Sequence, residues 1–162
     1  MNPDLHEMSN LKNLSLPILF YIIGTTKNST IYAYHLGSKI EKSIEIYSSK
    51  TAVDGDILGN VILIAGGVFN NKMLGTTQKI LILGDKSMNI FDLSIVNCAN
   101  LNFPRTYLAM IGINQSFYSI GGCSDENITL ERYCEMYDMK KEIWTIKHDL
   151  NFPNSSMTVL NI

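Results

Sequence analysis

The chain has 162 residues, which is enough for one domain of ordinary size. Hydrophobic residues make up 46% of it, so the sequence can bury a core and is unlike a disordered tail. The 13 basic and 15 acidic side chains leave a formal net charge of -2, which argues against nucleic acid as a partner, because phosphate binding needs a basic face.

The first predicted segment, residues 1–15, is expected to be a flexible tail. It lacks the basic start and apolar centre of a secretory signal. The apolar stretch Leu16–Ile23 follows, but Pro17 interrupts it and it is far too short to span a bilayer. We therefore expect a cytoplasmic protein that makes no membrane contact.

From residue 18 onward, clusters of Gly, Asn, Asp and Ser divide the chain into short runs rich in Ile, Val, Tyr, Phe and Thr, which suit a pleated sheet. No long segment has sustained helical spacing. The fold class predicted from this pattern is all-β. The predicted strands are Ile18–Ile23, Thr30–Leu36, Ser43–Ser48, Asn60–Ala65, Gln78–Leu83, Asn89–Leu93, Tyr107–Ile113, Ser116–Ile120, Tyr133–Tyr137 and Ile143–Lys147.

Internal repeats narrow the all-β class, because three landmarks recur in the same order at shifts near 50 residues. They are Leu101–Arg105 with Leu150–Asn154, Gly66-Gly67 with Gly121-Gly122, and Asp85 six residues before Phe91 with Asp138 six residues before Trp144. A weaker copy precedes them. The chain is therefore predicted to hold three repeat units, roughly 16–58, 59–105 and 106–154, with the start of a further strand at 155–162.

The last unit resembles the kelch repeat most closely. A diglycine is followed by Glu135, by Tyr137-Asp138, and by Trp144 seven residues after Tyr137. In the middle unit the same alignment puts Gly84 where Tyr is expected and Phe91 where Trp is expected. The resemblance implies a kelch-like β-propeller of about three four-stranded blades, which is an incomplete ring or a fragment. It also implies structural roles for Gly66, Gly67, Gly121, Gly122, Glu135, Tyr137, Asp138 and Trp144.

The function that the resemblance implies is a protein-interaction scaffold, with loops between strands contacting a protein partner. The candidate contact loops are Thr25–Asn28, Val68–Thr76 and Cys123–Asn127. In kelch-like propellers an Arg after the blade-closing Pro can lie near the central channel, where partners bind. The candidate binding residues are Arg105, Asn70, Asn71, Ser124 and Asp125. Three explanations of the incomplete ring stay open, namely that the chain is part of a longer protein, that copies pair to complete a ring, or that weak segments such as Met1–Asn13 hold further strands.

The histidines and cysteines of the sequence do not occur at the spacings of known catalytic or metal-binding motifs. His6, His35 and His148 are scattered, and none has a second ligand at metal spacing. Three cysteines without Cys-x-x-Cys spacing indicate neither a disulfide framework nor a zinc site, so we expect reduced thiols, no metal and no cofactor. Two alternatives stay open, namely an oxidase or sugar epimerase on the same fold, and a truncated or degenerate copy without independent activity.

Overall fold

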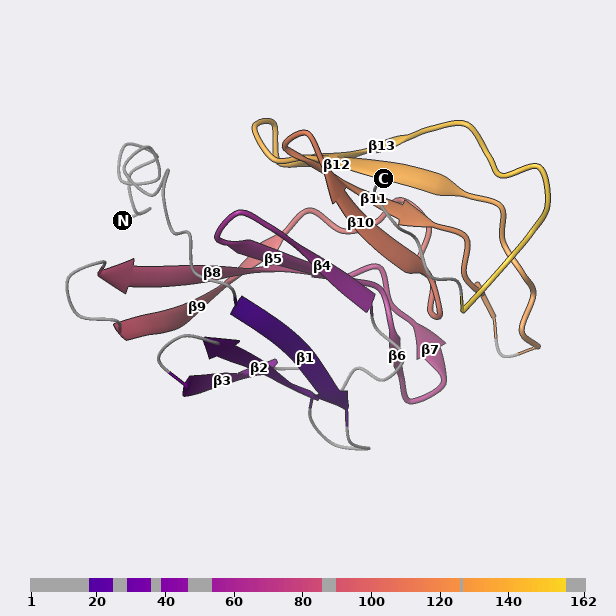
Figure 1. Ribbon diagram of the computed structural model, residues 1–162. Helices are drawn as coiled ribbons and strands as arrows, with labels where there is room; N and C mark the ends of the chain where they lie inside the picture. The colour runs from indigo at the N-terminus through magenta and orange to yellow at the C-terminus, as the bar shows by residue number, and fades with distance from the viewer. Residues whose placement is uncertain are drawn as a thin grey trace.

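The computed structural model describes residues 18–24, 29–35, 39–46, 54–85, 90–125 and 127–156 (Figure 1). The all-β class is confirmed, since these residues form strands arranged in four antiparallel sheets, none of which is closed. No helix that could cross a membrane occurs in this described part of the chain. The strands are β1 (Ile18–Gly24), β2 (Ser29–His35), β3 (Ile40–Ile46), β4 (Asp54–Leu58), β5 (Val61–Ala65), β6 (Val68–Phe69), β7 (Lys72–Met73), β8 (Thr77–Asp85), β9 (Ile90–Cys98), β10 (Ala109–Ile113), β11 (Ser116–Ile120), β12 (Cys134–Asp138) and β13 (Ile143–Ile146).

Three of the sheets form successive layers along the chain (Figure 1). The first sheet has the strand order β1-β2-β3, the middle sheet β4-β5-β8-β9, and the third sheet β10-β11-β12-β13. The fourth sheet is the short hairpin β6-β7, which lies in the chain connection between the paired strands β5 and β8. Strands that are neighbours in each sheet are therefore close in sequence, as expected for a chain of repeated antiparallel units.

The hydrophobic core lies between the layers and is divided by the middle sheet. Strand β5 is buried along its whole length because alternate side chains enter different cores. Ile62 and Ile64 pack toward the first sheet, whereas Leu63 and Ala65 pack toward the third. The first core comprises Ile31, Ala33, Ile46, Ile62, Ile64, Ile80 and Ile82. The second comprises Leu63, Ala65, Leu101, Leu108, Met110, Phe117, Tyr137 and Trp144.

The middle and third sheets repeat one pattern of backbone hydrogen bonds around their diglycines. Each diglycine donates both of its N–H groups, the first to the residue before the third strand and the second to the residue after the closing Pro. The four bonds are Gly66 to Thr76 at 3.1 Å, Gly121 to Tyr133 at 2.9 Å, Gly67 to Arg105 at 2.9 Å, and Gly122 to Asn154 at 2.8 Å. Two of the three sequence landmarks therefore occupy matching positions in the two sheets.

The strand register corrects the third landmark, which matched Asp85 and Phe91 with Asp138 and Trp144. Tyr137 pairs with Phe117 on one side and with Trp144 on the other. In the middle sheet, Ile80 pairs with Ile62 and with Ile95. The diglycine alignment places Ile62 at the position of Phe117, so Ile80 and Ile95 stand where the third sheet has Tyr137 and Trp144.

The physical reason for the wrong alignment is a longer hairpin. Ile80 and Ile95 are fifteen residues apart, whereas Tyr137 and Trp144 are seven apart. Gly84 and Phe91 pair with one another farther out along this extension of β8 and β9. The spacing of Gly84 and Phe91 relative to Asp85 therefore resembles the repeat in sequence only. The two residues do not occupy the sheet positions of Tyr137 and Trp144.

Three of the observed strands were not predicted from the sequence, namely β4, β6 and β7. Residues 54–58 were assigned to the first unit, but they form β4 and pair with β5 in the middle sheet. Gly55 lies between Asp54 and Asp56, and such residues are depleted in strands, so composition gave no signal. The other two missed strands, β6 and β7, have two residues each. The first sheet has three strands among the described residues rather than the expected four.

Trp144 joins the third sheet to the middle one. Its indole Nε1 donates to Thr77 Oγ1 at 3.0 Å and to the Ala99 carbonyl at 3.1 Å. We expect Trp144→Phe to lower the free energy of unfolding by about 2 kcal/mol, because both acceptors lose a partner and the smaller ring leaves a gap. Urea unfolding measures this, with Phe152→Leu as the control, since Phe152 is 80% exposed. Equal stability of the two variants would contradict this role.

Candidate functional site

Arg105, a predicted binding residue, lies in the protein interior with an exposed fraction of 0%. Its Nη2 forms an ion pair with Glu135 Oε1 at 2.9 Å. Burial lowers the pKa of the Arg105 guanidinium, and the Glu135 carboxylate opposes that shift. The remaining acceptors of the guanidinium are the Gly121 and Tyr133 carbonyls, both at 2.8 Å, Ser119 Oγ at 2.7 Å, and the Phe103 carbonyl at 3.2 Å.

Glu135 completes this buried network. Its carboxylate accepts the backbone N–H of Asn102 at 2.8 Å and of Phe103 at 3.2 Å, as well as the Asn102 side-chain amide at 2.7 Å. The segment that leads from the middle sheet to the third is thereby fastened to β12. Arg105 and Glu135 thus hold structural positions, and Arg105 offers no surface to a partner in this structure.

The other predicted structural residues lie where the chain turns or packs. All four glycines of the two diglycines have positive φ, between 60° and 109°. Tyr137 is 0% exposed and Trp144 is 7% exposed, with their rings 5.3 Å apart. Asp138 accepts the backbone N–H groups of Lys140 and Lys141, each at 2.9 Å, and these bonds help to lower the pKa of its carboxyl.

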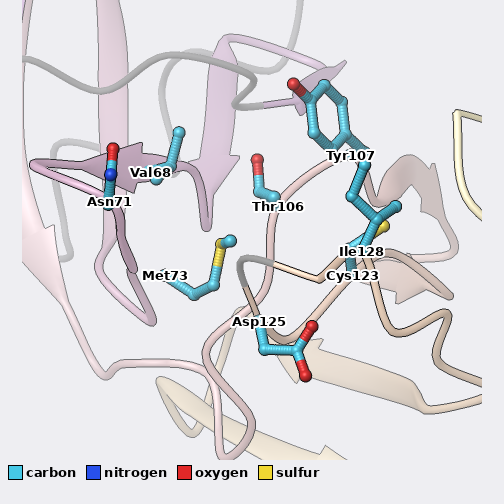
Figure 2. A pocket seen from close by; sticks show the side chains of 8 residues that line it. All are labelled: Val68, Asn71, Met73, Thr106, Tyr107, Cys123, Asp125 and Ile128. Atoms are coloured by element: carbon cyan, nitrogen blue, oxygen red, sulfur yellow. The ribbon is translucent and has the colours of Figure 1, made fainter.

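A cleft opens where loops of the middle and third sheets meet. Its volume is about 370 Å³. Figure 2 shows the hairpin residues Val68, Asn71 and Met73 on one side, with Tyr107, Cys123 and Ile128 on the other. The described lining residues are Val68, Asn71, Met73, Thr106, Tyr107, Cys123, Asp125 and Ile128. We refer to this feature as the loop cleft.

One wall of the loop cleft is the β6-β7 hairpin. Asn70 and Asn71 form its turn with φ of 47° and 59°, the left-handed conformation that a two-residue hairpin turn favours. Val68 and Met73 are directly paired across the hairpin and both line the cleft. The other pair is Phe69 and Lys72. Because side chains alternate along a strand, this second pair belongs to the opposite face of the hairpin.

The base of the loop cleft is held by the backbone. Cys123 and Thr106 exchange two hydrogen bonds, from Thr106 N–H at 3.0 Å and from Cys123 N–H at 2.8 Å. Cys123 also makes an isolated bridge with Leu130. The segment before β10 and the loop after Gly121-Gly122 are therefore fixed relative to each other. Cys123 is 1% exposed, so it contributes apolar surface below the opening.

Two apolar side chains at the loop cleft are exposed on left-handed backbone. Tyr107 has φ 53° and is 47% exposed, and Ile128 has φ 60° and is 62% exposed. This conformation brings Cβ close to a carbonyl oxygen, and it is a clear outlier for a β-branched residue. Backbone hydrogen bonds maintain it, since Ile128 N–H donates to the Asp125 carbonyl at 3.2 Å and Ser156 N–H donates to the Tyr107 carbonyl at 2.8 Å.

Asp125 places a fixed carboxylate at the loop cleft. Its Oδ1 accepts the Thr129 backbone N–H at 2.9 Å, and its Oδ2 accepts the Thr129 hydroxyl at 2.7 Å. These two bonds lower the pKa of the Asp125 carboxyl, so it is ionised at neutral pH. Each oxygen retains acceptor capacity for another donor. Asp125 is the single charged residue among the eight that line the cleft.

The sequence predictions and the loop cleft overlap in part. Asn71 and Asp125 line the cleft, and the other two loop candidates, Asn70 and Ser124, directly precede them in the chain. The contact loops predicted at 68–76 and 123–127 are brought together, whereas the third, at 25–28, lies outside the described residues. The further strand expected at 155–162 lies mostly outside them as well.

Sequence reasoning missed Tyr107 and Ile128. Tyr107 was assigned to a strand that in the structure begins two residues later, at Ala109. In the sequence, Ile128 is recognisable only as a β-branched residue inside a polar turn. That pattern does not indicate a binding site until the neighbouring segments of the fold are known.

Within the described ranges, no group of three or more His, Cys, Asp or Glu residues is arranged to hold a metal ion. The described lining residues of the loop cleft are mainly apolar or uncharged, with the Asp125 carboxylate among them. No protein-family model and no curated protein matches the chain, and the resemblance to the kelch repeat stays a prediction.

Proposed function

We propose that the chain is a protein-interaction scaffold built of kelch-like blades, and that a partner segment binds in the loop cleft. The single observation that carries the proposal is the pair of exposed apolar side chains, Tyr107 and Ile128, both held on left-handed backbone at one cleft. The matching diglycine hydrogen bonds in the middle and third sheets support the interpretation of these sheets as repeated blades.

Strain and exposure together favour a binding role over a packing role. A bulky residue on left-handed backbone is held at a cost of about 1–3 kcal/mol, and such positions gather at functional sites. Packing does not explain the strain at Ile128, because more than half of its surface is exposed at 62%. A partner that buries Tyr107 and Ile128 would gain the apolar area that the folded chain leaves in water.

The rigidity of the surrounding sheets fits recognition by loops. The cleft walls come from the hairpin between β5 and β8, from the segment before β10, and from the loop after β11. The Arg105 and Glu135 network fixes the connection between the two sheets directly before Thr106 and Tyr107. A partner segment would therefore meet preformed walls, which reduces the entropy lost on binding.

A peptide selection tests the proposal. Random peptides displayed on phage are selected against the purified full chain, and enriched sequences are synthesised with a fluorescent label. Their dissociation constants are measured by fluorescence anisotropy. We expect micromolar binders, the range typical of short segments that meet a small surface.

Ile128→Gly separates binding from folding. We expect the variant to weaken the selected peptides at least tenfold, because it removes an exposed apolar contact of the loop cleft. We also expect the free energy of unfolding of this variant to rise by up to about 1 kcal/mol, because glycine adopts φ 60° without strain. The variant should therefore unfold at a slightly higher urea concentration than wild type. A loss of binding together with unchanged or raised stability cannot be attributed to misfolding.

The matched control is Gln115→Gly. Gln115 also lies on left-handed backbone, with φ 64°, in the exposed turn between β10 and β11. This control is expected to share the small gain in stability and to leave the peptide affinity unchanged. Enriched peptides that bind wild type and Ile128→Gly equally well would place recognition elsewhere and contradict the proposed function.

A further inference from the structure

Building on the proposed function, we infer that the partner segment carries a cationic side chain, lysine or arginine, next to an apolar side chain. The inference combines the charge of the loop cleft with the apolar character of its walls. Among the described lining residues, Asp125 supplies the one ionic group, and Val68, Met73 and Ile128 supply aliphatic surface. The occupant is therefore a basic and apolar peptide segment of a protein.

The carboxylate of Asp125 is prepared for an added donor. Thr129 holds each carboxylate oxygen with one hydrogen bond, so the group is fixed in orientation before a partner arrives. Each of these oxygens accepts a further N–H from an ammonium or guanidinium group. A fixed, ionised acceptor loses little freedom on pairing, which favours a charge-assisted hydrogen bond over a mobile surface ion pair.

None of the eight described lining residues is a cation that could neutralise Asp125. The nearest lysine in the hairpin sequence is Lys72, which pairs with Phe69 and so belongs to the face opposite the cleft wall. Thr129, the side-chain partner of the carboxylate, is uncharged. The carboxylate therefore attracts a positive group from a partner and repels phosphate, which makes an RNA or a phosphopeptide a poor occupant.

The walls beside Asp125 suit an apolar neighbour and the stem of a long cationic side chain. Met73 is adaptable in shape, and Val68 is directly paired with it. The exposed ring of Tyr107 offers a π-face that attracts ammonium and guanidinium groups. Lysine and arginine also bury their methylene stems along apolar surface while their charged ends reach an acceptor.

The test uses peptides selected against the full chain, the substitution Asp125→Asn, and a salt series. Asparagine keeps a carbonyl acceptor for the Thr129 N–H, so the loop retains that local bond. We expect the enriched peptides to contain lysine or arginine beside an apolar residue, and we expect Asp125→Asn to weaken them about fivefold. Raising KCl from about 50 mM to about 500 mM should weaken binding to wild type and leave the weaker binding to Asp125→Asn almost unchanged.

Asp138→Asn is the matched control. Asp138 also accepts backbone N–H groups in a turn, but it lies between β12 and β13 and does not line the loop cleft. It should leave the dissociation constant and its salt dependence as in wild type. Circular dichroism and urea unfolding of both variants confirm that each is folded.

The outcomes separate this inference from the proposed function. Basic and apolar peptides whose salt-dependent affinity needs Asp125 support both. If the enriched peptides lose affinity for Ile128→Gly but contain no lysine or arginine, or bind Asp125→Asn as tightly as wild type, the inference of a basic partner is wrong. The loop cleft then remains a binding site. Peptides insensitive to Ile128→Gly, or a selection without any enriched peptide, overturn the proposed function itself.

Discussion

Replacing Arg105 with methionine is expected to lower the free energy of unfolding by about 4 kcal/mol, because it leaves the buried Glu135 carboxylate without its cation. Both side chains are 0% exposed, so water cannot replace the lost interaction. The substitution also removes the donors that bind the Gly121 and Tyr133 carbonyls. Urea unfolding followed by circular dichroism measures the change.

A loss of this size approaches the whole stability of a small domain, so the conservative variant Arg105→Lys provides a second measurement. Lysine keeps the charge but not the planar arrangement of donors, and we expect a loss of about 2 kcal/mol. The control is Arg132→Met. Its ion pair with Asp149 is 3.8 Å long and exposed, so its removal should change stability by less than about 1 kcal/mol. Equal effects at the two arginines would show that the Arg105 network does not hold the sheets together.

Gly66→Ala is expected to give the second large effect, a loss of about 3 kcal/mol. A Cβ at this position would lie 2.4 Å from the Arg105 carbonyl oxygen and 2.9 Å from Leu108 Cδ2, so the strand connection would have to move. The backbone φ of 71° adds left-handed strain for any side chain. Thermal and urea unfolding measure the combined effect.

Gly59→Ala separates the two causes. Gly59 has φ 65°, similar to Gly66, but a Cβ there meets nothing within 4 Å. This control therefore reports the strain alone, which we expect to be about 1 kcal/mol. If the two alanine variants lose the same stability, close contact between the diglycine and the Arg105 backbone contributes nothing.

Much of the fold was predictable because strand formation follows local composition. Each predicted strand overlaps an observed one, and the continuous apolar run of β5 matches a strand buried on both faces. The missed strand β4 has the opposite character, since Gly55 flanked by aspartates has low strand propensity. It forms because the turn at Gly59 reverses the chain and allows β4 to pair with β5 through the backbone.

The candidate site was only half predictable, for a physical reason. Asn71 and Asp125 are polar residues in turn-rich segments, which composition predicts to be loops, so both were predicted as binding residues. Tyr107 and Ile128 are apolar, and composition alone assigns such residues to strands or core. Arg105 shows the converse, because the resemblance to the kelch repeat made it a candidate binding residue, whereas its ion pair with Glu135, thirty residues later, is buried. Contacts between distant segments hold Tyr107 and Arg105 in their positions, from Ser156 and from Glu135 respectively.

The most direct test of the account is hydrogen–deuterium exchange of the full chain with and without a selected peptide. We expect slower exchange in 67–74, 106–108, 122–125 and 127–130, the segments that line or flank the loop cleft, and no change in β13 or in the β8-β9 hairpin. The same peptide should give no protection on Ile128→Gly. Protection confined to other surfaces, with these segments unchanged, would contradict a binding role for the loop cleft.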